Sequence, residues 1–149
     1  MARTASRLLI CAAAAAVMLA ALSACGTVGS LRGSDEGASS EKEAANVKPE
    51  DPLARPTQIG WTSARATRCG FIFSPDQLRA NYLAWEMSVG HSEAEMRKIE
   101  KAYDYTRESV TETIKDNPTY CNKERTDQIR IDLNRYLSGD YTPNARMAR

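Results

Sequence analysis

The sequence has little of what catalysis usually requires. Among its 149 residues there is a single histidine, His91, and the surrounding segment His-Ser-Glu-Ala-Glu lacks the second histidine of a zinc motif. A serine hydrolase would have to use His91 as its base, and the sequence has no nucleophile-elbow pattern. We therefore interpret His91 as a surface residue in a turn between two helices. We predict no catalytic residue, no metal site and no cofactor.

The sequence also has almost equal numbers of basic and acidic residues. Lys and Arg number 20 against 19 Asp and Glu, a formal net charge of +1. If residues 1–24 are removed, Arg3 and Arg7 leave with them, and 18 basic residues then face 19 acidic ones. Such a balance gives no electrostatic basis for binding nucleic acid. Charges between residues 123 and 135 alternate in sign, which is typical of a solvated helix face and makes a basic patch for an anionic surface the weaker alternative.

The N-terminal stretch has the layout of an export signal. Arg3 and Arg7 precede an unbroken apolar run from Leu8 to Leu22, and small residues follow at positions 23 and 24. A helix needs about 20 apolar residues to cross the core of a bilayer, and this alanine-rich run is shorter. The pattern therefore favours a signal that is removed over a helix that stays in the membrane.

The end of this run, Leu22-Ser23-Ala24-Cys25-Gly26, resembles the lipobox of bacterial prolipoproteins. The resemblance implies transfer of a diacylglycerol to the Cys25 thiol, cleavage between Ala24 and Cys25, and acylation of the new amino terminus. A cysteine with two or three acyl chains would anchor the protein stably. Gly26 stands where the family's inner-membrane retention signal usually has Asp, which favours the outer membrane in a two-membrane bacterium. The alternative is an ordinary secretory signal with a chance cysteine.

The four cysteines have different expected roles. Cys11 leaves with the signal, Cys25 carries the lipid, and Cys69 and Cys121 remain as a pair in an oxidising setting. We predict a disulfide between Cys69 and Cys121, with two reduced thiols as the alternative. Closing this loop would stabilise the fold by about 4 kcal/mol, which matters for a small core.

The chain after the signal peptide at residues 1–24 divides into a linker and one small helical domain. Residues 25–58 are rich in Gly, Ser, Ala, Glu, Lys and Pro, which predicts a lipidated N-terminus and a disordered linker. The domain at residues 59–142 contains three amphipathic segments, at 74–90, 92–117 and 122–139, each bounded by capping residues. We predict an all-α fold, a three-helix up-down-up bundle that brings the two cysteines to one end, and a disordered tail at 143–149.

The aromatic residues are few and fall into two groups. Those on the predicted inner helix faces are expected in the core, and they are Tyr82, Trp85, Tyr103 and Tyr136. Trp61, Phe71 and Phe73 precede the first capped segment. We expect them to cover the end of the bundle, because a small bundle is short of apolar area. The alternative is an exposed aromatic patch that binds a partner.

These observations predict a lipoprotein of the bacterial cell envelope. Lipid on Cys25 would hold it at the cell membrane or the outer membrane, with the domain in the periplasm or at the cell surface. The expected role is non-catalytic binding of an envelope protein or of a cell-wall component such as peptidoglycan. The alternative is an accessory subunit or inhibitor of an envelope enzyme, or an enzyme itself, since a fold alone does not settle function.

Overall fold

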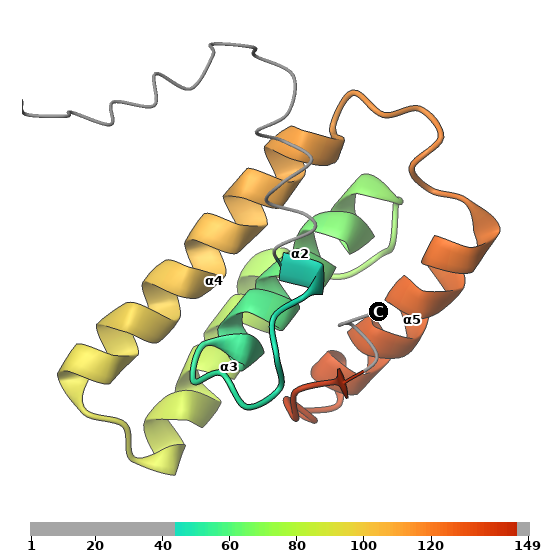
Figure 1. Ribbon diagram of the computed structural model, residues 1–149. Helices are drawn as coiled ribbons and strands as arrows, with labels where there is room; N and C mark the ends of the chain where they lie inside the picture. Colours follow the sequence, from blue (N-terminus) through green and yellow to red (C-terminus); the bar gives the residue numbers. More distant parts are fainter. Residues whose placement is uncertain (1–43, 146–149) are drawn as a thin grey trace, which may run out of the picture. The chain divides into compact units, whose positions relative to one another are not determined.

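The computed structural model describes residues 44–145, and this part of the chain forms four helices and no strand. The helices are α2 (Ala54–Arg68), α3 (Pro75–Val89), α4 (Glu93–Ile114) and α5 (Lys123–Leu137), and successive helices run in alternating directions (Figure 1). The all-α prediction is confirmed, but the count of three is not, because α2 adds a helix. Ala24 and Cys25, the predicted cleavage and lipidation positions, lie outside the described residues. No described helix is both long and apolar enough to span a membrane.

The three predicted helices begin at the predicted capping residues, and α3 also ends at its predicted cap, whereas α4 and α5 end slightly earlier than predicted, at Ile114 and Leu137. The Ser74 side chain accepts a hydrogen bond from a backbone N–H in the first turn of α3, and Asn122 does the same for α5. Ser92 and Glu95 form a capping box at the start of α4, which has 22 residues and is the longest described helix. α3 ends at Gly90 with φ of 97°, a left-handed conformation that glycine adopts at little cost.

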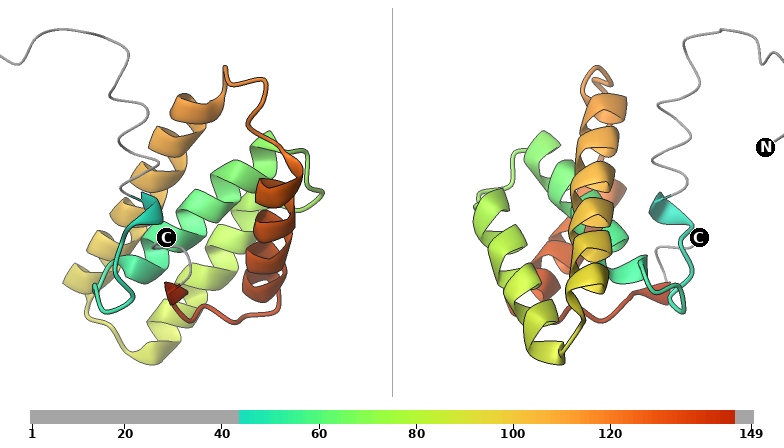
Figure 2. Two further views of the ribbon diagram at one scale, coloured as in Figure 1. Left: turned by 45° about the vertical axis from the view of Figure 1, so that its right-hand side comes forward. Right: turned by 90° about the vertical axis from the view of Figure 1, so that its left-hand side faces the viewer.

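The helix that sequence analysis missed, α2, is the centre of the packing. Eleven of its 15 residues are buried. It packs chiefly against α4 and then against α5, and the left view of Figure 2 shows it between them. Gly60 permits the close approach to α4, because a Cβ at this position would lie 2.6 Å from the carbonyl oxygen of Tyr103.

Tyrosines dominate the larger of two core clusters. Tyr82, Tyr103 and Tyr136 are fully buried, as predicted, and Tyr141 joins them from the segment after α5. The ring of Tyr82 lies 6.0 Å from that of Tyr103 and 5.3 Å from that of Tyr141. Trp85 is only partly buried, at the edge of this cluster. The smaller cluster lies between α2 and the C-terminal half of α4.

Both ends of the domain reach beyond the predicted boundaries. α2 begins at Ala54, inside the segment predicted to be a linker, and Ala44 is buried against the smaller cluster. At the other end, Asn144 exchanges two hydrogen bonds with the buried amide of Gln58, at 3.2 and 2.8 Å. A buried amide needs such partners. Residue 144 is therefore part of the fold, although we predicted a disordered tail from residue 143.

Candidate functional site

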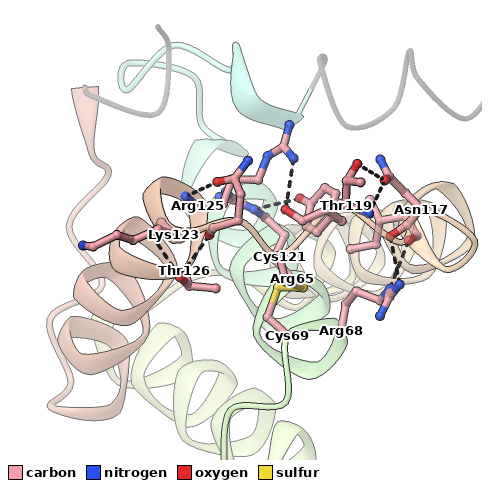
Figure 3. The surroundings of a disulfide bond; sticks show 12 residues. Arg65, Arg68, Cys69, Asn117, Thr119, Cys121, Lys123, Arg125 and Thr126 are labelled. Atoms are coloured by element: carbon pink, nitrogen blue, oxygen red, sulfur yellow. Dashed lines mark hydrogen bonds between the residues drawn. A yellow bond between two sulfur atoms is a disulfide. The ribbon is translucent and has the colours of Figure 1, made fainter.

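Cys69 and Cys121 form the predicted disulfide, with their Cα atoms 5.5 Å apart (Figure 3). Cys69 directly follows α2, and Cys121 comes one residue before Asn122, the cap of α5. The bridge therefore ties the C-terminal end of α2 to the N-terminal end of α5. Sequence analysis correctly expected the cysteines to meet at one end of the bundle, but it did not foresee that a helix leads into Cys69.

Three arginines fix the loop before α5 around this bridge (Figure 3). Arg65 donates from Nε to the Tyr120 hydroxyl at 2.9 Å, and its guanidinium lies 3.8 Å from the centre of the Trp61 ring. Arg68 donates to two backbone carbonyl oxygens at the end of α4 and in the loop. Arg125 donates to the backbone oxygen of Tyr120 at 3.0 Å. These contacts make this end of the domain a rigid scaffold.

The aromatic entry segment does not form the partner patch that we considered as an alternative. Trp61 is 4% exposed, because α2 turns its ring into the smaller core cluster. Phe71 and Phe73 are half-buried and pack against the larger cluster. Ile72, between them, is the fully exposed residue of this segment. Burial, the interpretation that we favoured for these rings, therefore agrees with the structure.

The carboxylate of Glu86 borders a hollow, although only 1% of its side chain is exposed. Arg55, at the start of α2, reaches its two oxygens at 2.9 and 3.0 Å. The Tyr82 hydroxyl donates to Oε1 at 2.7 Å, and His91 Nε2 lies 2.9 Å from Oε2. Burial, and then the bond to Glu86, raise the pKa of Tyr82 above its usual value. We call these four residues the Glu86 cluster.

Sequence analysis missed the Glu86 cluster. His91 does lie in the turn between α3 and α4, but it is half-buried against Glu86, where we expected a surface residue with no group nearby. Its Nε2 lies close to the carboxylate but forms no hydrogen bond within the described residues. Glu86 follows Leu78 and Tyr82 at intervals of four, so its position on the buried face of α3 was readable from spacing. Arg55 was hidden because its segment was assigned to the linker.

A groove runs beside the cluster, between residues 44–53 and α4. It consists of adjoining hollows of 280, 350 and 440 Å³ that all border Asp51. The smallest lies against Arg55, Glu86 and His91. The 440 Å³ hollow is lined by Ala44, Val47, Asp51, Leu53, Thr57, Lys98, Lys101, Ala102, Tyr105, Thr106 and Ser109. The two larger volumes fall in the range of small-molecule sites.

The hollows of the groove differ in the side chains that line them. The hollow beside Glu86 and His91 is bordered by no serine, threonine or cysteine of residues 44–145. Within the same residues, no group of three His, Cys, Asp or Glu side chains is placed to hold a metal ion. The ring of Tyr105 is 67% exposed in the wall of the 440 Å³ hollow.

Comparisons of the chain with protein-family models, curated proteins and solved structures find no match. A function for this chain therefore has to be inferred from the chemistry of the groove, the Glu86 cluster and the cysteines.

Proposed function

We propose that this protein is a bacterial lipoprotein, anchored at the cell membrane or outer membrane through acylated Cys25, and that its helical domain is a non-catalytic binding module. The observation that carries the proposal is the Cys69–Cys121 disulfide, because such bonds persist in oxidising compartments outside the cytoplasm. It supports the export signal and the lipobox resemblance at residues 1–26. The domain would then face the periplasm or the cell exterior.

The groove between residues 44–53 and α4 is the proposed binding site of this module. Its 440 Å³ hollow combines apolar walls with the exposed ring of Tyr105, a residue type that is enriched in binding surfaces. The Glu86 cluster has a structural role beside the groove, because its carboxylate already accepts hydrogen bonds from Arg55 and Tyr82. The proposed ligand is a component of the envelope, either a protein or part of the cell wall.

The anchor is tested by replacing the cysteine of the lipobox. Cys25→Ser, which lacks the thiol, should abolish incorporation of an alkyne-labelled palmitate and leave an unlipidated precursor. Cys11→Ser, in the signal segment, is the matched control and should be labelled normally. Persistent labelling of Cys25→Ser, or equal loss in the control, would contradict the lipoprotein proposal.

The binding role is tested by placing the photocrosslinking residue p-benzoylphenylalanine at Tyr105 and irradiating intact cells. An adduct is expected from position 105, and its mass identifies the ligand. Position 72 is the control, because Ile72 is fully exposed and does not line the groove. Absence of an adduct at 105, or the same adducts from both positions, would contradict the assignment of the groove.

A further inference from the structure

The groove has the lining of a site for one elongated apolar chain. In the 440 Å³ hollow, Val47 and Leu53 face Ala102 and Tyr105 of α4. The 350 Å³ hollow continues this lining to Ile99. Leu53 and Lys98 border both hollows, so one extended molecule can occupy both.

Two lysine ammonium groups lie at the groove. Lys98 and Lys101 both line the 440 Å³ hollow and are exposed, and neither forms an ion pair with a residue that the structure describes. By contrast, Lys115, further along α4, does form an ion pair, with Glu112. The two cations at the groove are therefore available to an anion from outside the chain.

The acidic side chains that border the same hollows have other partners. Asp51 Oδ1 accepts a hydrogen bond from the backbone N–H of Leu53 at 2.7 Å. Glu95 accepts bonds from the hydroxyl and the backbone N–H of Ser92, at 2.6 and 2.8 Å. These bonds, the hydroxyl first, lower the pKa of Glu95, and the charge of Lys98 contributes less. Glu95 thus serves the capping box and forms no ion pair with Lys98.

The walls of the groove suit an acyl chain better than an extended peptide. The backbone of such a peptide needs hydrogen-bond partners, which peptide-binding domains commonly supply from the edge of a sheet. One wall here is α4, whose interior backbone groups bond within the helix, and residues 44–145 contain no strand. An acyl chain has no polar group along its length, and its burial contributes about 0.8 kcal/mol per methylene.

We infer that the groove binds a long-chain fatty acid, with the acyl chain between residues 47–53 and α4 and the carboxylate at Lys98 and Lys101. Two ammonium groups three residues apart on a helix lie on the same side and can donate to one carboxylate. This inference rests on the proposed binding role of the groove, but it names a fatty acid as the ligand in place of the protein or cell-wall component proposed above.

The test uses the full chain in phosphatidylcholine nanodiscs with a diazirine analogue of palmitic acid. After irradiation, mass spectrometry of the peptides should place the label in residues 47–53 and 98–109. Lys98→Ala combined with Lys101→Ala should reduce labelling roughly tenfold, since each exposed charge pair contributes up to about 1 kcal/mol. Lys115→Ala combined with Lys123→Ala removes the same charge away from the groove and should leave labelling unchanged. All four lysines are exposed, so these variants should fold.

Two further measurements test whether the ligand needs a carboxylate and whether it is a free fatty acid or a phospholipid. A diazirine analogue of hexadecanol, which lacks the carboxylate, should label the groove roughly tenfold less than the acid. Excess phosphatidylglycerol in the nanodisc should compete weakly; full competition would assign the groove to a lipid headgroup and overturn the fatty acid. Equal labelling by acid and alcohol, or no label in the groove, would also overturn it.

The crosslinking experiment at position 105 separates the failure of this inference from the failure of the proposed function. If position 105 crosslinks a protein or a glycan in cells, the proposed binding module stands without the fatty acid. If it crosslinks nothing, both proposals fail.

Discussion

The two ends of α2 are held in place by different chemistry. At the C-terminal end, a covalent bond joins Cys69 to Cys121. Nearby Arg65 is buried against Trp61 and forms no ion pair with a residue that the structure describes. At the N-terminal end, Arg55 is held by two hydrogen bonds to the buried carboxylate of Glu86.

The central helix therefore depends on its surroundings in two separate ways. The end at Cys69 depends on the redox state of the compartment, because only an oxidising one maintains the bond. The end at Arg55 depends on a buried negative charge, which is stable only with all of its partners. Because α2 packs against both α4 and α5, loosening either end affects the whole core.

The largest effect is expected at the disulfide. Cys69→Ser combined with Cys121→Ser should lower the free energy of unfolding by about 4 kcal/mol, because the bridge closes a loop with a sequence separation of 52. Urea denaturation followed by circular dichroism measures this. The wild-type protein in reducing buffer should show the same loss. A loss below about 1 kcal/mol in both samples would mean that packing alone holds this end of α2.

A smaller loss of stability is expected at the N-terminal end of α2. Glu86→Gln keeps the shape of the side chain but removes the charge that faces Arg55, so the free energy of unfolding should fall by about 2 kcal/mol. The control is Glu93→Gln, which disrupts the exposed pair with Arg97 and should cost less than about 0.5 kcal/mol. Equal losses in the two variants would show that burial gives Glu86 no special role.

The smallest loss of stability is expected in the middle of α2, at Gly60. Gly60→Ala places a Cβ 2.6 Å from the carbonyl oxygen of Tyr103, so α2 has to move away from α4. Strain of this kind costs about 1–3 kcal/mol, and the better helix propensity of alanine offsets about 1 kcal/mol. The melting temperature should fall by a few degrees. A rise would mean that the helices separate without cost and that only the ends of α2 matter.

Three of the four described helices could be predicted from the sequence, because the residues that mark them lie within each helix or next to it. Ser74, Ser92 and Asn122 mark the helix starts, and apolar residues recur at helical spacing after each. α2 was not readable, because Leu53 at its start provides no side-chain cap and because the helix carries polar residues inward. Gln58, for example, is a core residue only because Asn144 returns to bond with it.

The candidate groove could not be predicted for a related reason. It exists because residues 44–53 lie along α4, and their composition resembles that of a disordered linker. The disulfide was predictable from the number and position of the cysteines. The Glu86 cluster was partly predictable from the spacing of α3, but its partner Arg55 is 31 residues away in the sequence.

The pairing of Gln58 with Asn144 constrains when the protein can fold. Most partners of α2 come later in the sequence, and they include α4, Cys121, α5 and finally residue 144, at a separation of 86. A chain that emerges from its N-terminus first cannot complete the contacts of its central helix until residue 144 has arrived. The domain therefore completes its folding late, which allows a chain exported across a membrane to pass through before it folds.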